Sequence, residues 1–121
     1  MGIMRALNIA AALSGALALA MLALSAHALS GEGAERVLLD GFIQLSAAAA
    51  GLAISNRAGW INFAAGALIL AGAAVFAGVL YTISLTHDRS LAMAAPAGGF
   101  ALILGWALLA FAKPGSRAGQ A

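Results

Sequence analysis

The side chains that could do chemistry in this sequence are few, and they stand well apart along the chain. Four of them are candidates for a functional role: His27, Asp40, Gln44 and Tyr81. Histidine changes charge near neutral pH, so His27 could titrate or bind a ligand at the end of an apolar run. The structural alternative is a histidine at the membrane interface that donates a hydrogen bond to a loop carbonyl.

Asp40 and Gln44 are four residues apart, so they share one face of a helix. An ionisable side chain inside a membrane is costly and should face other helices, with Arg36 on the same face as its partner. The alternative, which the sequence favours, places Asp40 at the level of the lipid headgroups near a helix N-terminus. Gln44 is expected to hydrogen-bond between helices rather than to hold a substrate.

Three aromatic residues, Trp60, Tyr81 and Trp106, stand near the ends of apolar runs. Amphipathic aromatic rings gather at membrane–water interfaces, and anchoring there explains all three residues. A quinone or lipid-headgroup site beside the phenol of Tyr81 is the functional alternative.

The sequence contains no set of residues typical of an enzyme. It has no serine–histidine–acid set with positional support, no phosphate-binding loop and no paired carboxylates. It has no cysteine, and its two histidines are too few for a zinc site made of histidine alone, which needs at least three ligands. We therefore predict no catalytic activity, no cofactor and no metal ion.

The composition indicates a membrane protein. Of the 121 residues, 64% are hydrophobic and only 8% are charged, whereas soluble domains carry roughly a quarter charged residues. Lipid is the natural solvent for such a chain, and the lipid bilayer is its first predicted partner. The formal net charge of +2 is too small to indicate nucleic acid as a partner.

Four segments are long and apolar enough to span a bilayer as helices, which takes about 20 residues. They cover residues 3–24, 37–54, 60–85 and 91–112. In lipid each must be helical, because an open strand would leave backbone groups unpaired. We therefore predict an all-α membrane protein with four antiparallel transmembrane helices in a compact bundle.

The predicted connections are short, except for the one at residues 29–36, which contains two glycines. Short connections force neighbouring helices to be antiparallel. The four helices form a single domain, residues 1–113, and the tail at residues 114–121 is predicted to be mobile in the cytoplasm.

The first segment has a second interpretation. Arg5, an apolar run and then Ala26-His27-Ala28 resemble a signal peptide with its cleavage site. The apolar run is longer than the 7–15 residues usual in signal peptides, so the sequence favours a retained helix. Cleavage would leave three helices and an N-terminus outside.

Charged residues are distributed unequally between the two predicted sides of the membrane. With the N-terminus inside, the inner side receives four basic residues and no acid: Arg5, Arg57, Lys113 and Arg117. The outer side receives two arginines and all four acids: Arg36, Arg89, Glu32, Glu35, Asp40 and Asp88. This asymmetry predicts that both termini are cytoplasmic, in the inner membrane of a bacterial cell.

Small residues four apart recur in every predicted helix, as in Ala74 with Gly78 and Ala101 with Gly105. They let helix backbones approach closely, which is how helices associate in lipid. In the fourth segment, Pro96 with Gly98 and Gly99 indicates either a kink within the helix or the first turn of the helix.

In these segments the sequence resembles the domain-of-unknown-function 423 family, which includes the transmembrane protein 256-like proteins. Residues 75–81 resemble that family's "F-S-G-S-L-Y" stretch, residues 95–100 its "T-P-x-G-G", and Gly105 with Trp106 its "G-W". Residues 25–29 resemble the "G-A-H-x-L" that ends its first helix, and Gln44 resembles part of its "Y-Q". The resemblance implies a four-helix membrane protein of uncharacterised role with a retained first helix.

This chain departs from the family pattern by having fewer polar groups. Residues 43–47 contain no histidine where family members commonly have one, and Ala77 and Val79 stand where the family has serine. Ala95 likewise replaces a hydroxyl residue before Pro96. A family function that relied on those groups would be weakened here.

Two functions remain as hypotheses. The first is an interaction component of the membrane, either a homo-oligomer or an accessory subunit of another membrane protein. The second is an oligomeric transporter or channel for ions or small solutes, with the four candidate polar residues around its path. The first accounts better for a chain with many small residues and little chemistry.

Overall fold

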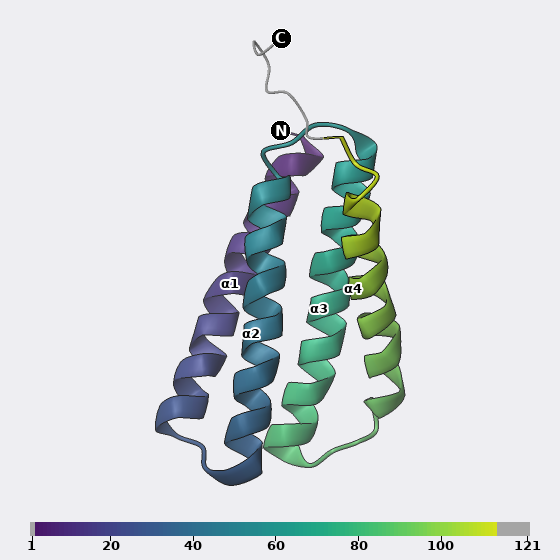
Figure 1. Ribbon diagram of the computed structural model, residues 1–121. Coiled ribbons are helices and arrows are strands. Elements are labelled where there is room, and N and C mark those ends of the chain that lie inside the picture. Colours follow the sequence, from purple (N-terminus) through teal and green to yellow (C-terminus); the bar gives the residue numbers. More distant parts are fainter. Residues whose placement is uncertain (1, 114–121) are drawn as a thin grey trace.

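A computed structural model describes residues 2–113 of the chain, so the predicted tail at 114–121 lies outside the described residues. Four long helices follow one another (Figure 1): α1 (Ile3–His27), α2 (Gly31–Ile54), α3 (Trp60–Thr86) and α4 (Ala95–Leu109). A short 3-10 helix, η1 (Ala92–Ala94), precedes α4. The described residues form no strand, and the predicted all-α class with four packed helices is confirmed.

Each of the four helical segments is long and apolar enough to cross a membrane, judged by length and composition. The connections between consecutive helices lie at alternate ends of the molecule, and the first and last described residues lie at one end (Figure 1). Many large apolar side chains remain exposed, among them Trp60, Met93 and Phe111. Such a surface suits lipid as the surrounding solvent, since it has little polar area to offer water.

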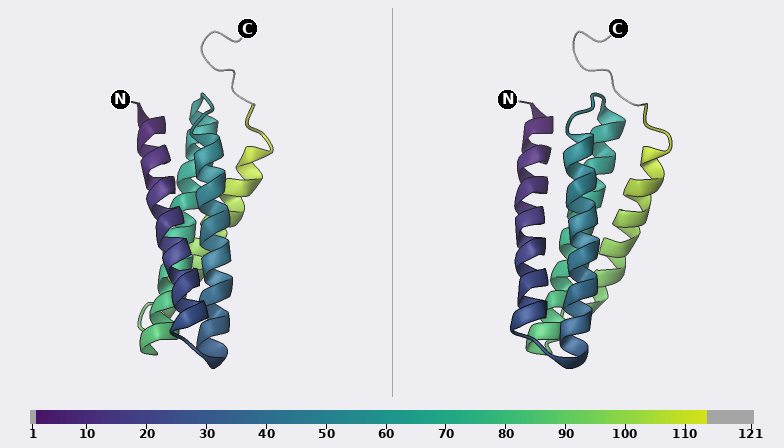
Figure 2. Two further views of the ribbon diagram at one scale, coloured as in Figure 1. Left: turned by 90° about the vertical axis from the view of Figure 1, so that its left-hand side faces the viewer. Right: turned by 60° about the vertical axis from the view of Figure 1, so that its left-hand side comes forward.

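The helices pack as a series rather than as a closed ring. α2 packs on α1 and α3, α1 makes a smaller contact with α3, and α4 packs on α3. Within the described residues α4 does not contact α1 or α2, and these views place α1 and α4 at opposite edges (Figure 2). The bundle is therefore open on the side between α1 and α4.

α2 begins six residues earlier than predicted. Residues 31–36, expected to belong to a long loop, are the first turns of the helix, and the connection shrinks to residues 28–30. Glu32 lies in the first turn, where its charge is favourable, and it pairs with Arg36 at 3.7 Å, four residues on. The prediction followed apolar residues alone and so missed a polar first turn.

α4 begins at Ala95, later than predicted, and Pro96 lies in its first turn. Of the two interpretations of Pro96, the helix start is therefore correct and the mid-helix kink is wrong. A proline in the first turn removes an N–H that would have no partner within the helix anyway.

The interior joins α1, α2 and α3. One group of buried side chains includes Leu7, Ala11, Ile54, Ile69 and Leu70, and a second contains Val37, Ala77 and Tyr81. Alanines among these buried side chains, including Ala11, Ala47, Ala73 and Ala77, let the helices approach closely, as expected for helices that associate in lipid.

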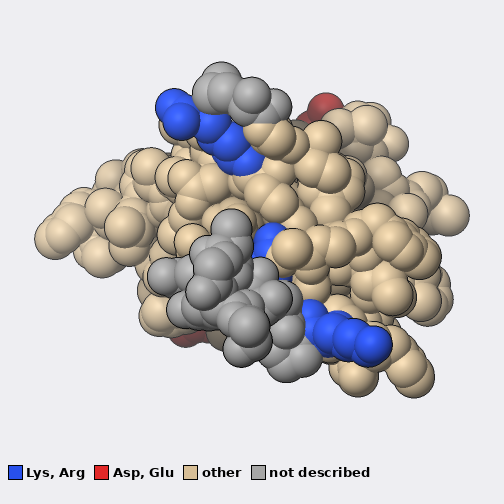
Figure 3. All heavy atoms as spheres, turned by 90° about the horizontal axis from the view of Figure 1, so that it is seen from above, with Lys and Arg blue, Asp and Glu red and all other residues tan. Residues whose placement is uncertain are grey.

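The end of the bundle that carries the first and last described residues is basic. Seen from that end, Lys and Arg side chains project, while Asp and Glu are visible only at the rim (Figure 3). Arg5 belongs to the start of α1, Arg57 to the α2–α3 connection and Lys113 follows α4. The opposite end, near the α3–α4 connection, contains Asp88 and Arg89.

Candidate functional site

The structure brings three of the four candidate polar residues together. Asp40 and Gln44 on α2 and Tyr81 on α3 are all buried, with 5%, 4% and 8% of their surface exposed. His27, at the last turn of α1, is exposed and takes no part in this group. The candidate site is thus the polar interior shared by α2 and α3.

A chain of side-chain hydrogen bonds crosses this interior. The hydroxyl of Tyr81 donates to Oε1 of Gln44 at 2.7 Å, and Nε2 of Gln44 donates to Oγ of Ser14 at 3.2 Å. One amide therefore joins α3, α2 and α1, which is the interhelical role that the sequence indicated for Gln44. Buried polar groups without partners are costly, so these linked hydrogen bonds favour one register of the three helices.

Two of the residues in these hydrogen bonds, Tyr81 and Ser14, were not predicted to take part in them. Tyr81, predicted to anchor at the interface, has a buried ring, and its hydroxyl donates a hydrogen bond to Gln44. Ser14 was not among the candidate polar residues predicted from the sequence, although it accepts a hydrogen bond from Gln44. A hydroxyl in the middle of an apolar run was the one signal that could have identified it as a hydrogen-bond partner.

Asp40 is also buried inside the bundle, with 5% of its surface exposed, and its level relative to the lipid headgroups stays a prediction. It belongs to the stripe of α2 that faces the other helices, together with Val37, Gly41 and Gln44. Its Oδ2 is buried and has no hydrogen-bond partner among the described residues. Arg36, the predicted partner, instead forms its ion pair with Glu32.

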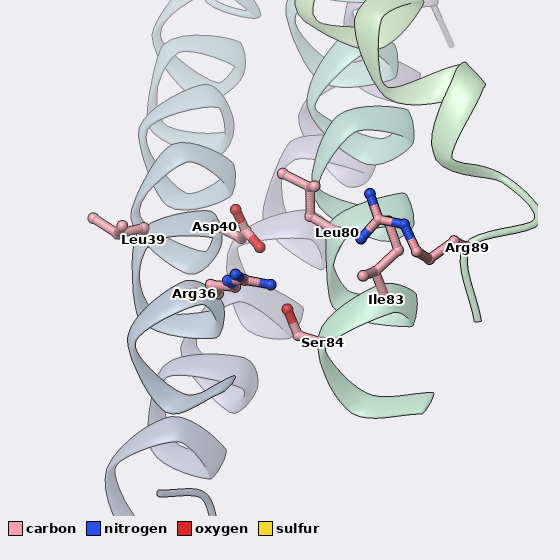
Figure 4. Close-up of a pocket in the computed structure, with 7 residues that line it drawn as sticks. All are labelled: Arg36, Leu39, Asp40, Leu80, Ile83, Ser84 and Arg89. Carbon is pink, nitrogen blue, oxygen red and sulfur yellow. The ribbon is translucent and has the colours of Figure 1, made fainter. Parts of the chain in front are cut away.

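Asp40 lines a pocket of about 320 Å³ between α2 and α3 (Figure 4). Its other lining residues are Arg36 and Leu39 of α2, Leu80, Ile83 and Ser84 of α3, and Arg89 of the α3–α4 connection. The pocket therefore combines one buried carboxyl group, two guanidinium groups and three aliphatic side chains.

A second hollow, of about 300 Å³, continues this pocket toward the end of the bundle. The two share Arg36, Ile83, Ser84 and Arg89, and the outer one adds Glu32, Gly33 and His87. Together they form a groove, which we call the α2–α3 groove, leading from the helix ends to Asp40. His87, which the sequence analysis left without a role, borders this groove.

The turn that carries Arg89 is held by local hydrogen bonds. His87 ends α3 in a left-handed conformation with φ of 60°, and the backbone N–H of Asp88 donates to Oγ1 of Thr86. The backbone N–H of Ser90 donates to Oδ1 of Asp88 at 2.9 Å. These hydrogen bonds from Ser90, backbone and side chain, hold the pKa of Asp88 below its ordinary value.

The residues predicted to shape helix packing fall into two groups. Gly98 and Gly105 lie where α4 touches α3, because a Cβ on Gly98 would come within 2.6 Å of the backbone N of Phe76. Gly99 has ordinary space beside the Phe76 ring, and a Cβ on Gly78 would meet nothing within 4 Å. Gly78 therefore has no packing role within the described part of the chain.

The described residues contain no group of three or more His, Cys, Asp or Glu side chains placed to hold a metal ion. The other polar groups at the site are the guanidinium groups of Arg36 and Arg89, the amide of Gln44, and the hydroxyl groups of Tyr81, Ser14 and Ser84. The arrangement can bind charged or hydrogen-bonding groups, with Asp40 as acceptor and the arginines as donors.

The chain matches a known protein family. A family model described as "Protein of unknown function (DUF423)" matches residues 21–99, from the second half of α1 to the first turns of α4. All residues that line the α2–α3 groove fall within this range, whereas Ser14 precedes it. No solved structure matches the chain.

Proposed function

The chain belongs to the DUF423 family, a family of unknown function, and from this premise we propose that it is an accessory component of the membrane that binds another transmembrane helix. The helix that it binds belongs either to a second copy of the chain or to another membrane protein. The proposal includes no catalytic step.

The observation that carries the proposal is an apolar groove of about 410 Å³ between α1 and α3, which we call the α1–α3 groove. It is made mostly of small side chains: Ala6, Leu7, Ala10 and Ser14 of α1, and Phe63, Ala67, Leu70, Ala71 and Ala74 of α3. Without a hydrophobic driving force between them, helices in lipid associate where small residues permit close contact. A groove with alanine walls suits a third helix better than it suits flexible acyl chains.

The open architecture supports the same proposal. In the described residues α4 packs on the side of α3 away from this groove and does not reach α1. α3 continues the groove with an outward face that includes Ala71, Ala74 and Gly78, all at least partly exposed. A partner helix would close the side of the bundle that α4 leaves uncovered.

We propose further that the protein lies in a bacterial inner membrane with both termini in the cytoplasm and with its first helix retained. The basic end of the bundle, which carries the first and last described residues, supports this orientation. The hydrogen bond between Gln44 and Ser14 supports retention, because removal of α1 would leave the buried amide without that partner.

The test is assembly in the native membrane. Ala71→Leu and Gly78→Leu each place a bulky side chain on the outward face of α3. At Gly78 an added Cβ meets no other atom of the described chain within 4 Å. Ala12→Leu, on the exposed opposite side of α1, is the matched control. Native mass spectrometry after gentle extraction should give a complex for the wild type and the control, and less of it for both α3 variants.

A strictly monomeric wild type, both in native membranes after crosslinking and after extraction, would contradict the proposal. So would α3 variants that assemble as well as the control. Ala101→Leu is unsuitable for this test, because Ala101 packs against Gly72 inside the α3–α4 contact.

A second function, oligomeric transport of ions or small solutes, is favoured by one observation. Asp40 and the Ser14–Gln44–Tyr81 chain place polar groups in the interior, where ionisable groups usually have a role. Toward the basic end, however, the core is mostly apolar, with Leu7, Ile54 and Leu70, and Asn62 is a buried polar side chain there. A conducting path would therefore require several copies.

Flux into proteoliposomes distinguishes this second function from the first. Transport that Asp40→Asn abolishes, with the protein still folded and inserted, would favour it. If vesicles containing the wild type take up none of a varied set of ions and solutes, the second function is excluded.

A further inference from the structure

The α2–α3 groove combines groups of opposite charge that do not pair with each other. At its inner end the carboxylate of Asp40 points into the space between the helices, with Oδ2 buried and unpartnered in the described chain. The guanidinium groups of Arg36 and Arg89 point toward the same space from α2 and from the α3–α4 connection (Figure 4). A ligand that satisfies all three must itself carry both signs of charge.

The two arginines form the anion-binding part of the groove. Arg36 pairs with Glu32 at 3.7 Å, but both side chains are largely exposed, so that pair is weak and easily exchanged. Arg89 forms no ion pair within residues 2–113. Guanidinium groups present several donors in a plane, and two of them at one pocket match the oxygens of a phosphate.

Asp40 excludes a simple anion. A phosphate alone would sit beside a carboxylate and leave its buried oxygen unpartnered, whereas a simple cation would be repelled by the arginines. An ammonium group next to a phosphate provides donors for Asp40 and acceptors for the arginines. Arg36 and Asp40, one helical turn apart on α2, are close enough for one small ligand to reach both.

We propose that the α2–α3 groove binds a phosphoethanolamine group, with its phosphate at Arg36 and Arg89 and its ammonium at Asp40. The pocket, at about 320 Å³, is at the lower end of the range of small-ligand sites. The aliphatic walls formed by Leu39, Leu80 and Ile83 suit the glycerol and acyl part of a lipid. The same chemistry is offered by an aminophospholipid and by free phosphoethanolamine.

This inference goes beyond the proposed function and does not depend on it. The phosphoethanolamine site lies between α2 and α3, and the surface for a partner helix lies between α1 and α3. Loss of one should leave the other intact.

The first experiment compares three phospholipids with identical acyl chains on the purified full-length protein, by native mass spectrometry. Phosphatidylethanolamine should be retained most strongly. Phosphatidylcholine has a phosphate and a cation but no N–H to donate, and phosphatidylglycerol has a phosphate but no cation. Equal retention of the three lipids would overturn the proposal.

Two variants, Arg89→Gln and Asp40→Asn, test the anion-binding and the ammonium-binding parts of the groove separately. Arg89→Gln should weaken phosphatidylethanolamine binding about tenfold, the order expected for one lost charge-assisted hydrogen bond. Arg57→Gln removes the same charge at the other end of the bundle and is the matched control. If Arg89→Gln binds as the control does, the proposal is wrong.

Asp40→Asn should remove the preference for phosphatidylethanolamine over phosphatidylglycerol while leaving some binding through the arginines. A preference that survives in a folded Asp40→Asn protein would count against the assigned role of Asp40. If the Asp40→Asn protein does not fold, Arg89→Gln still tests the proposal. Arg89 lies in an exposed connection, so its substitution should not disturb folding.

Free phosphoethanolamine identifies the source of the group. Binding of the free compound, measured by calorimetry in detergent, would support the site and point to a solute. Binding of the lipid alone would support the site and point to a membrane lipid. Binding of neither would overturn the proposal.

Discussion

At the residue scale, the hydrogen bond from Tyr81 to Gln44 is the best-defined feature of the interior. Both side chains are buried, and the amide of Gln44 also reaches Ser14 on a third helix. In lipid an amide that loses one partner has no water nearby to replace it. These residues therefore specify how the helices fit, whether or not the protein binds a ligand.

Tyr81→Phe should destabilise the protein by about 1 kcal/mol, the size typical of interhelical hydrogen bonds in membranes. The ring still fits its place, while Oε1 of Gln44 loses its donor. Reversible unfolding in mixed micelles measures the change. Ser46→Ala is the control, because the Ser46 hydroxyl is exposed and bonds only a carbonyl of its own helix. Equal effects of both substitutions would contradict the role of Tyr81.

The turn with Asp88 predicts a pH dependence. Its pKa is lower in the folded protein than its ordinary value of 3.8. The carboxylate therefore stabilises the turn above pH 3.8, and this stabilisation is lost as the pH falls through the lowered folded pKa. The amide resonance of Ser90 should follow this titration in NMR spectra and should not do so in Asp88→Asn. A wild-type midpoint at or above 3.8 would contradict the assignment.

At the element scale, the contact between α3 and α4 depends on glycine. A Cβ on Gly72 would lie 2.8 Å from the carbonyl oxygen of Gly98, and one on Gly105 would lie 3.0 Å from that of Ala65. These are backbone atoms, which cannot move aside as a flexible side chain does. Among the four long helices α4 contacts only α3, so this contact holds it in place against the rest of the bundle.

Gly98→Ala should therefore destabilise the packing of α4 by about 1–3 kcal/mol, as overpacking usually does. Gly78→Ala is a matched control in the neighbouring helix, since a Cβ there meets nothing within 4 Å. It should be neutral or should stabilise α3 by up to about 1 kcal/mol through helix propensity. Proteolysis and unfolding measurements on both variants give the comparison, and a neutral Gly98→Ala would contradict the close approach.

At the scale of the whole molecule, the charge distribution and the open bundle together suggest how the protein sits in a membrane. Both described chain ends and the α2–α3 connection lie at one end, which is also the basic end (Figure 3). In the orientation that we propose, following the positive-inside rule, this end faces the cytoplasm. The α2–α3 groove then opens on the opposite side of the membrane.

This orientation can be tested cleanly because the chain has no cysteine of its own. Leu91→Cys, in the exposed α3–α4 connection, should react with a membrane-impermeant maleimide in intact cells. Asn56→Cys, in the α2–α3 connection, should react only after the cells are permeabilised. The reverse pattern, or labelling of both residues in intact cells, would contradict the proposed topology.

Much of this architecture follows from the sequence by itself. Four apolar segments with few charges leave the chain no soluble alternative, and lipid requires each to pair its own backbone groups as a helix. The resemblance to the DUF423 family likewise followed from local motifs, and the family match confirms it. Helix ends were harder to predict, because residues 31–36 are polar and yet helical.

Only the tertiary structure decided which polar side chains meet. Sequence spacing placed Asp40 and Gln44 on one face of α2, but it did not determine which neighbouring helix that face would contact. The rotation of α2 against α3 turns both residues inward, brings Tyr81 to Gln44 and leaves His27 outside. Arg89 reaches the groove beside Asp40 because its side chain extends from the α3–α4 connection back across α3. Contacts between residues far apart in the chain depend on how each helix is rotated and how the helices cross. The apolar pattern of a membrane helix specifies this rotation only weakly, because lipid accepts any apolar face.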